Sequence, residues 1–423
     1  MLATLRQRDF ALLWIAGLIS IAGNYALIVA LPLHAYALTG SAIATGGVFA
    51  ATVLPRILLG SVAGVFVDRW DRKWTMVAAD LLRAAVMLPL LAVVSSDLLW
   101  LLYLVRAVTG MLGLLFEPAE AALLPRLVGE ERLVTANALN ALNNNLGRLI
   151  GPAIGGVLYA AGGMPAVVVV DAASFAASGV LIMAIRTRAQ PERADLPSAG
   201  ASAWGRALGE WRAGLQFVAG DRSLQTLFVA FGVGFVGEGT FALAFTPLAV
   251  DVLQGGAEGA GILVSAQAVG GLLAGVLVSR AAARFAPRAL FGWGLIGLGF
   301  ADLGLANAAS IVPPGPPAVA LAAVCMALAG PPIVIAVAAG RGLLQTLTVD
   351  AFRGRVFGAL GSAEGVTMLL GLVLGSAVVG QTGVVFVLSL GAAMWIAGGL
   401  FALVRLPSDV GVDHSGDGAT PAR

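Results

Sequence analysis

Long apolar stretches alternate with short polar connections along almost the whole chain. Each stretch reaches the roughly 20 residues that an α-helix needs to cross about 30 Å of hydrocarbon. The hydrophobic pattern therefore predicts an all-α membrane protein with twelve spans, at approximately residues 10–32, 43–67, 74–95, 98–120, 136–161, 165–186, 223–250, 258–280, 288–308, 317–343, 355–379 and 383–405.

Positive charge gathers in every second connection. Of the 25 Lys and Arg residues, the ones that lie well inside the predicted spans are Arg56, Arg83, Arg106, Arg148 and Arg341, and all others occupy the termini or alternate connections. Cytoplasmic loops collect Lys and Arg because cationic segments translocate poorly. The asymmetry predicts that both termini lie in the cytoplasm. The excess of Ala, Gly and Arg is typical of a GC-rich bacterial genome and favours a bacterial inner membrane.

The composition excludes a soluble globular protein, because 59% of the residues are hydrophobic and only 11% are charged. The net charge of +2 follows from the basic loops and does not indicate a nucleic-acid partner. The chain has no Walker loop, and neither His34 nor His414 has metal-ligand or triad neighbours in the sequence. We therefore expect no enzymatic activity, no cofactor and no metal. The single Cys325 permits no intrachain disulfide.

The longest polar interval divides the spans six and six. It predicts an N-terminal half over residues 1–187, a cytoplasmic linker over 188–222, a C-terminal half over 223–405 and a disordered cytoplasmic tail over 406–423. Apolar positions recur with helical spacing between Trp204 and Val218. This segment either lies along the inner membrane surface or extends the seventh helix into the cytoplasm.

Three glycines in and after the fifth span recur 220 residues later. Gly151, Gly155 and Gly163 correspond to Gly371, Gly375 and Gly383. Six-span halves related by a parallel repeat are typical of one large class of secondary transporters, which hold the substrate between the halves near the midplane. The shared offset therefore favours two six-helix halves with pseudo-two-fold symmetry.

The connection between the second and third spans carries a glycine followed by a charged run: Gly64, Asp68, Arg69, Arg72 and Lys73. This run resembles the signature loop of the major facilitator superfamily, with Asp71 at a position where that family usually has Gly. The resemblance implies the major facilitator fold and a cytoplasmic latch that closes the outward-facing state. In such a latch Asp68 lies against the start of the eleventh helix, here Arg353–Arg355. The alternative is an ordinary basic loop.

The fifth span carries a second glycine motif, formed by Gly147, Gly151, Pro152, Gly155 and Gly156. It resembles the motif of proton-coupled antiporters, although Ala138 stands where that motif has a further Gly. Gly and Pro together produce a bent helix with a smooth, closely packed face, which suits a gate between the halves. The alternative is generic packing of small residues.

Further runs resemble a subgroup that contains macrolide-efflux and enterobactin-exporter proteins. They lie at residues 5–10, 116–118, 124–125, 136–137, 171–175 and 353–357. The resemblance implies efflux of small amphiphilic compounds (a drug, a macrolide or a siderophore-like molecule) by alternating access, with protons as the coupling ion. A monomer is expected. An importer or uniporter, and a transport-dead membrane sensor or scaffold, are the alternatives.

Polar residues inside the spans are the candidates for the cavity and for proton coupling: Asn24, Arg56, Arg106, Arg148, Glu238 and Glu364. A charge at mid-membrane costs about 2.5–3.5 kcal/mol on insertion scales, so such residues usually face the bundle interior. Arg106 and Gly110 resemble the superfamily's Arg-x-x-x-Gly signature on a cavity-lining helix. Asn24 stands where the subgroup commonly has Asp, so a proton role cannot be carried over to it.

Two interpretations of these charges remain open. They titrate during transport, or they form structural pairs that hold the halves together. The first interpretation predicts that Glu238 and Arg106 face one central cavity, since the superfamily lines its cavity with the first, fourth, seventh and tenth spans. Glu364 is a rival proton carrier. We also expect Asp80 to pair with Arg83 or with the latch, and the sixth and ninth spans, which carry Asp171 and Asp302, to support the cavity without lining it.

Overall fold

The computed structural model describes residues 2–67, 70–187, 203–282 and 284–407. Those residues are nearly all helical, as the hydrophobic pattern predicts. The N-terminal half contains α1 (Leu2–Leu5), α2 (Arg8–Thr39), α3 (Ala42–Val67), α4 (Arg72–Met87), η1 (Leu88–Ala92), η2 (Ser96–Leu98), α5 (Leu99–Val128), η3 (Glu130–Arg132) and α6 (Leu133–Met183). The third span is shorter as an α-helix than predicted, because Pro89 lies in the first turn of the 3₁₀ segment η1, which begins at Leu88.

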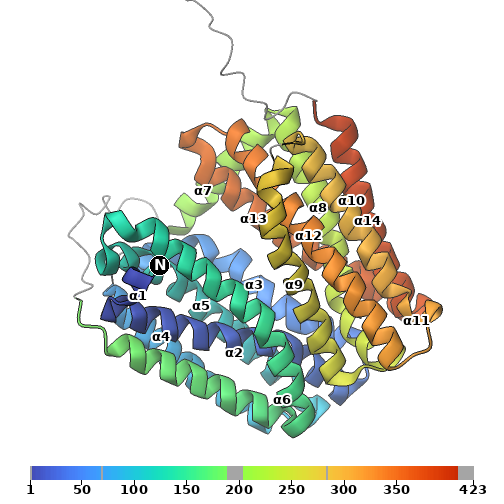
Figure 1. Ribbon diagram of the computed structural model, residues 1–423, viewed down its shortest axis with the longest axis horizontal. Helices are drawn as coiled ribbons and strands as arrows, with labels where there is room; N and C mark the ends of the chain where they lie inside the picture. The colour runs from blue at the N-terminus through green and yellow to red at the C-terminus, as the bar shows by residue number, and fades with distance from the viewer. Residues whose placement is uncertain (1, 68–69, 188–202, 283, 408–423) are drawn as a thin grey trace, which may run out of the picture.

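The C-terminal half contains α8 (Arg222–Pro247), η4 (Leu248–Val252), α9 (Gly256–Ala282), α10 (Pro287–Ala306), α11 (Ala308–Ile311), α12 (Pro316–Leu347), α13 (Asp350–Thr382) and α14 (Val384–Arg405). The π-helical turn η4 follows Pro247 at the end of α8. In Figure 1 the halves form two separate groups of helices, blue to green and yellow to red. Three clusters of buried apolar residues lie within single halves, whereas a fourth joins Val29 and Leu33 of α2 to the C-terminal half.

Among the described residues, eleven helical segments are long and apolar enough to cross a bilayer. One of them, Glu130–Met183, contains 54 residues and is long enough for two crossings. Gly163 interrupts α6 with φ 63°, a left-handed conformation that glycine adopts without steric cost. The fifth and sixth predicted spans are the two arms of this helix, and the twelve-span topology follows.

The linker helix α7 (Ala203–Ala219) is separate from α8. It ends before Asp221, whose side chain accepts a hydrogen bond from the Leu224 amide at 2.8 Å and so caps the start of α8. The idea that this segment extends the seventh helix is therefore wrong. Helix α7 packs on α13, where Phe217 stacks on Phe352 with ring centroids 4.7 Å apart. The remainder of the predicted linker, residues 188–202, and the tail from 408 lie outside the described residues.

The structure also relates the glycines of the repeat. Gly163 and Gly383 both have positive φ, 63° and 80°, at the turns that follow the fifth and eleventh spans. Gly151 lies against the backbone of α2, and Gly371 lies against the backbone of α8. The fifth span thus packs on the first as the eleventh packs on the seventh. This equivalence accounts for the 220-residue offset in physical terms.

Chain direction gives the bundle two chemically different ends. The basic end carries the start of α2, the connection from α3 to α4, α7 and the connection from α12 to α13. The bare end carries the connections from α2 to α3 and from α8 to α9, the Gly163 turn and the Gly383 turn. No Lys or Arg lies in these bare-end connections.

Candidate functional site

The two halves approach most closely where α6 meets α9. A Cβ added to Gly156 would lie 2.5 Å from the Ala257 carbonyl oxygen, and one added to Gly261 would lie 2.5 Å from the Pro152 carbonyl oxygen. The other glycines of the motif pack within the N-terminal half, because Gly147, Gly151 and Gly155 all lie against α2. The motif therefore forms two closely packed faces, one toward α2 and one toward the opposite half.

Three hydrogen bonds join described residues of the two halves. Thr45 Oγ1 on α3 donates to the Leu243 carbonyl on α8 at 2.8 Å, and the Tyr36 hydroxyl on α2 donates to Asp251 in η4. Both lie toward the bare end. The third joins Arg148 Nη2 on α6 to Gln267 Oε1 on α9 at 3.4 Å, near mid-depth. The described contacts thus close the boundary at the bare end.

A cavity of about 150 Å³ lies between the halves next to these contacts. Its walls come from α2, α3, α8, α9 and α12 and are mostly apolar, with Glu238, Gln267 and Thr246 as the polar members; the other lining residues are Ile28, Val29, Pro32, Phe49, Phe241, Ala242, Phe245, Ala260, Val264 and Met326. An apolar cavity with a few convergent polar groups suits an amphiphilic small molecule. The structure thus brings Glu238 to a central cavity, at the boundary of the halves.

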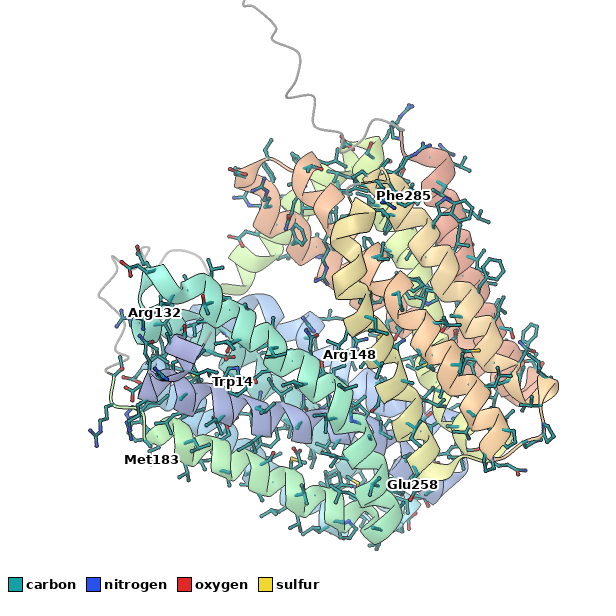
Figure 2. All side chains as sticks on the ribbon, viewed as in Figure 1. Trp14, Arg132, Arg148, Met183, Glu258 and Phe285 are labelled. Carbon is teal, nitrogen blue, oxygen red and sulfur yellow. The ribbon has the colours of Figure 1, made fainter. Side chains whose placement is uncertain are left out.

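Glu238 faces a cation from the opposite half. The charge of Arg148 acts on Glu238, and Gln267, which accepts from Arg148, lines the same cavity. Figure 2 shows Arg148 on α6, at the side of the N-terminal half that is turned toward α9. A second acid, Asp302 on α10, is buried and interacts electrostatically with Glu238. Sequence reasoning missed Gln267, since an uncharged amide in a span gives no strong signal.

Glu364 also interacts electrostatically with two cations, one from each half. It lies on α13, where Arg341 of α12 and Arg56 of α3 act on its charge. Two of the candidate acids therefore interact with a cation across the boundary, Glu238 with Arg148 and Glu364 with Arg56. This arrangement agrees with the interpretation that the charges hold the halves together. It is equally compatible with carboxyl groups that titrate when the halves separate.

Arg106 lies in a different environment from Glu238. Its Nε donates to Thr52 Oγ1 at 2.8 Å, and its Nη1 donates to Asn24 Oδ1 at 3.5 Å. The acid that acts on its charge is Asp171 of α6. Within the described part of the chain, no contact joins Arg106 to Glu238. It therefore stays a prediction that Arg106 and Glu238 face one cavity. The structure does show that Arg106 lies next to Asn24.

A buried ion pair lies next to this group. Arg83 Nη1 donates to Asp80 Oδ1 at 3.3 Å, so the expected pairing of these two residues on α4 is confirmed. Ser178 on α6 donates to the other Asp80 oxygen at 2.6 Å. The guanidinium carbon of Arg83 lies 5.3 Å from the ring centroid of Phe175, on the same helix. The pair thus ties α4 to the second arm of α6.

The described part of the latch motif bonds within the N-terminal half. Arg72 donates to the Ala122 carbonyl at 3.2 Å, and Lys73 donates to the Ile185 carbonyl at 2.7 Å. Cations near the carboxyl ends of helices are favourable, because unpaired carbonyls concentrate there. Gly64 lies in α3, whereas Asp68 and Arg69 fall outside the described residues. On the proposed partner helix, Arg353 pairs with Asp350 at 2.8 Å.

At the basic end a larger cavity of about 320 Å³ lies among α3, α7 and α13. Its lining includes Leu58 of α3, Trp211 of α7 and Arg355 of α13. Helix α7 approaches α13 closely here, since a Cβ on Gly214 would lie 2.5 Å from the Arg355 carbonyl oxygen. The linker helix thus lies against the two spans to which the latch motif and its proposed partner belong.

A family model described as a transmembrane secretion effector, MFS_3, matches residues 1–417. The chain belongs to this family. It is a major facilitator transporter and not an enzyme, and the resemblance to the major facilitator superfamily is confirmed. The predicted fold, two six-span halves of all-α structure, is that of the family.

Efflux proteins are among the relatives. The chain is 29% identical over 388 residues to the multidrug efflux pump Tap of Mycolicibacterium fortuitum, a match that covers 87% of this chain and 88% of that protein. It is 30% identical over 213 residues to the uncharacterized MFS-type transporter YfiS of Bacillus subtilis (strain 168), covering 50% and 49%. It is 26% identical over 179 residues to macrolide efflux protein A of Streptococcus pyogenes, covering 42% and 44%. The matches to YfiS and to the macrolide efflux protein thus span about half the length of those relatives.

Solved structures of transporters share the fold of this family member. A bacterial homologue of the iron transporter ferroportin in an inward-facing state has a TM-score of 0.73 at 14% identity, covering 94% of this chain and 98% of that one. The nucleoside transporter NupG, as its D323A mutant, has a TM-score of 0.72 at 12% identity, covering 94% and 100%. At these identities the likeness establishes the architecture alone.

Proposed function

We propose that this transporter exports small amphiphilic compounds, of drug, macrolide or siderophore-like chemistry, in exchange for protons. The observation that carries the proposal is the cavity between the halves, which is mostly apolar but contains Glu238 with Arg148 and Gln267 at its edge. An apolar wall suits an amphiphile, and a carboxyl group at the boundary of two moving halves can gain and lose a proton. The efflux relatives support the direction of transport.

The conformation described above is, in this proposal, the one open toward the cytoplasm. Contacts between Gly156 and α9, and between Thr45 and α8, hold the bare end shut. The positive-inside rule assigns the basic end to the cytoplasm. We therefore place both termini in the cytoplasm of a bacterium and the protein in the inner membrane. One chain supplies both walls of the cavity, which supports a monomer as the transporting unit.

The decisive experiment uses the purified full-length protein in liposomes with an imposed pH gradient. We expect uphill movement of at least one radiolabelled macrolide, siderophore or cationic dye, and none in liposomes without protein. Expression in an efflux-deficient bacterial host should lower sensitivity to the same compound. Failure of both assays across the panel would contradict the export proposal.

Two other functions make different predictions. An importer or uniporter would accumulate the compound in the opposite direction in inverted vesicles, or without any gradient. A membrane sensor or scaffold would bind a compound without turnover. The latch motif distinguishes a transporter from a sensor or scaffold, because a protein that does not alternate between two conformations has little use for a latch. We expect Asp68→Asn to reduce turnover sharply while expression and ligand binding stay near normal, and unaltered transport would remove the latch from the proposal.

A further inference from the structure

Asp171 is a buried acid that the proposed pathway does not use. It lies on the second arm of α6 with only 1% of its surface exposed. Its Oδ1 accepts a hydrogen bond from Ser174 Oγ at 3.2 Å, while its Oδ2 has no hydrogen-bond partner among the described residues. On the facing helix α2 the nearest position is Gly23, where any added Cβ would collide with the Asp171 carboxyl group. Helix α2 thus leaves room for this carboxyl group without supplying a donor to it.

Two cations act on the charge of Asp171 but donate their hydrogen bonds to other residues. The charged groups that act on it are Arg106 from α5 and Arg83 with Asp80 from α4, and the facing position on α2 is the uncharged Gly23. Arg83 donates to Asp80, and Arg106 donates to Thr52 and Asn24. A carboxylate that served only as a structural counter-ion would be expected to accept a hydrogen bond from one of these guanidinium groups. A third acid, Glu117 of α5, acts on Arg83 together with Asp80 and Asp171.

We propose that Asp171 is a proton-carrying residue of the N-terminal half, acting together with Arg106. The proposal rests on the export function proposed above. In one orientation of the halves the Asp171 carboxylate takes a proton from a hydronium ion, which becomes water, and the side chain becomes a neutral carboxylic acid. In the other orientation the O–H bond breaks, the proton passes to water on the opposite side, and the carboxylate is restored.

This step changes the electrostatic environment of Arg106. Asp171 is the acid that acts on the charge of Arg106, whereas Arg83 repels that charge. Protonation of Asp171 therefore removes the negative charge that offsets this repulsion. Arg106 donates hydrogen bonds to Thr52 on α3 and to Asn24 on α2. Both of these helices also contribute to the wall of the central cavity. Proton uptake can therefore alter the field at the cavity without a direct contact between Asp171 and substrate.

The test uses full-length protein in liposomes with a radiolabelled macrolide and an internal pH-sensitive dye. For Asp171→Asn we expect loss of uphill, pH-driven transport, at least tenfold below the parent protein, with exchange of labelled for unlabelled macrolide retained within about twofold. The double variant Asp171→Asn with Asn24→Asp returns a carboxyl group to Arg106 and should restore a substantial part of the pH-driven transport. Glu258→Gln, which changes an exposed acid at the start of α9, is the comparison and should leave both transport and exchange unchanged.

A second readout needs no substrate. Infrared difference spectra of the purified protein, taken between about pH 5 and pH 8, should contain a carboxylic acid C=O band that Asp171→Asn removes and Asp302→Asn leaves in place. Three outcomes would each overturn the role of Asp171. They are an unchanged band in Asp171→Asn, normal pH-driven transport in that variant, and an equal loss of exchange and uphill transport in the correctly folded variant. If the parent protein moves no compound under a gradient, the export function fails and this role fails with it.

Discussion

Gly156 on α6 and Gly261 on α9 lie against each other's helix across the boundary between the halves. Each occupies a position where a Cβ would come within 2.5 Å of a backbone carbonyl oxygen of the opposite helix. Backbone carbonyls cannot move aside as a flexible side chain can, so only glycine permits this approach. The contact is therefore a direct measure of how closely the bare end is shut.

Enlarging Gly156 should open this contact. We expect Gly156→Val to force α6 and α9 apart and to reduce transport about tenfold or more, since overpacking typically costs about 1–3 kcal/mol. Gly156→Ala should have a smaller effect of the same sign. Transport by each variant, and the accessibility of single cysteines placed in the cavity to a membrane-impermeant thiol reagent added at the bare end, measure the change. Gly380→Val is the control, because nothing lies within 4 Å of a Cβ at that position.

Neutralising Glu238 should separate coupling from binding. We expect Glu238→Gln to abolish uphill transport driven by a pH gradient while substrate binding or exchange is preserved, because Gln keeps the size of the side chain but cannot carry the proton. The measurement is uptake into liposomes with and without the gradient. Glu258→Gln, an exposed acid at the start of α9, is the matched control. A Glu238→Gln protein with normal pH dependence would contradict the proton role of Glu238 and leave Glu364 and Asp171 as the candidates.

Removing Arg106 should impair both binding and coupling. Arg106→Ala withdraws the guanidinium group from Thr52 and Asn24 and leaves Asp171 without the cation on α5. We expect exchange and pH-driven transport to fall together, by about tenfold or more. Thr52→Val tests whether the orientation of Arg106 matters, since it removes only the hydrogen bond at 2.8 Å. It should lower the free energy of unfolding by about 1–3 kcal/mol or less. Exchange at the level of the parent protein in Arg106→Ala would contradict this assignment.

The pair of Asp80 and Arg83 should matter for stability more than for transport. The Asp80 side chain is 0% exposed and that of Arg83 is 13% exposed. Removing one partner of a buried pair leaves an uncompensated charge and costs about 3–5 kcal/mol. We expect Arg83→Leu to lower the thermal unfolding temperature of the purified protein clearly. Combining it with Asp80→Asn should recover part of the loss, because no buried charge then remains unpaired, and a double variant as unstable as Arg83→Leu would refute the pairing.

Much of the site could be predicted from local sequence. The glycine motif predicts a smooth helix face, and the structure uses it against α2 and α9. The adjacency of Asp80 and Arg83 follows from their i, i+3 spacing, which places both on one face of α4. Gln267 and the partnerless oxygen of Asp171 could not be found in this way. Their importance comes from what the neighbouring helices place beside them, and no spacing within a single span encodes that.

The sequence by itself determined the number and lengths of the spans, the end of the bundle at which basic residues gather, and the presence of charges at mid-depth. These properties follow from the thickness of the bilayer and from the cost of placing charge in it, and each span meets those requirements on its own. Only the tertiary structure decided that Arg148 bonds to Gln267 and acts on the charge of Glu238, that Arg106 bonds to Asn24 and Thr52, and that α7 packs on α13. Such pairings depend on how each helix is rotated and tilted against its neighbours. Rotation and tilt are set by the packing of small residues between helices, which hydropathy along one span does not report.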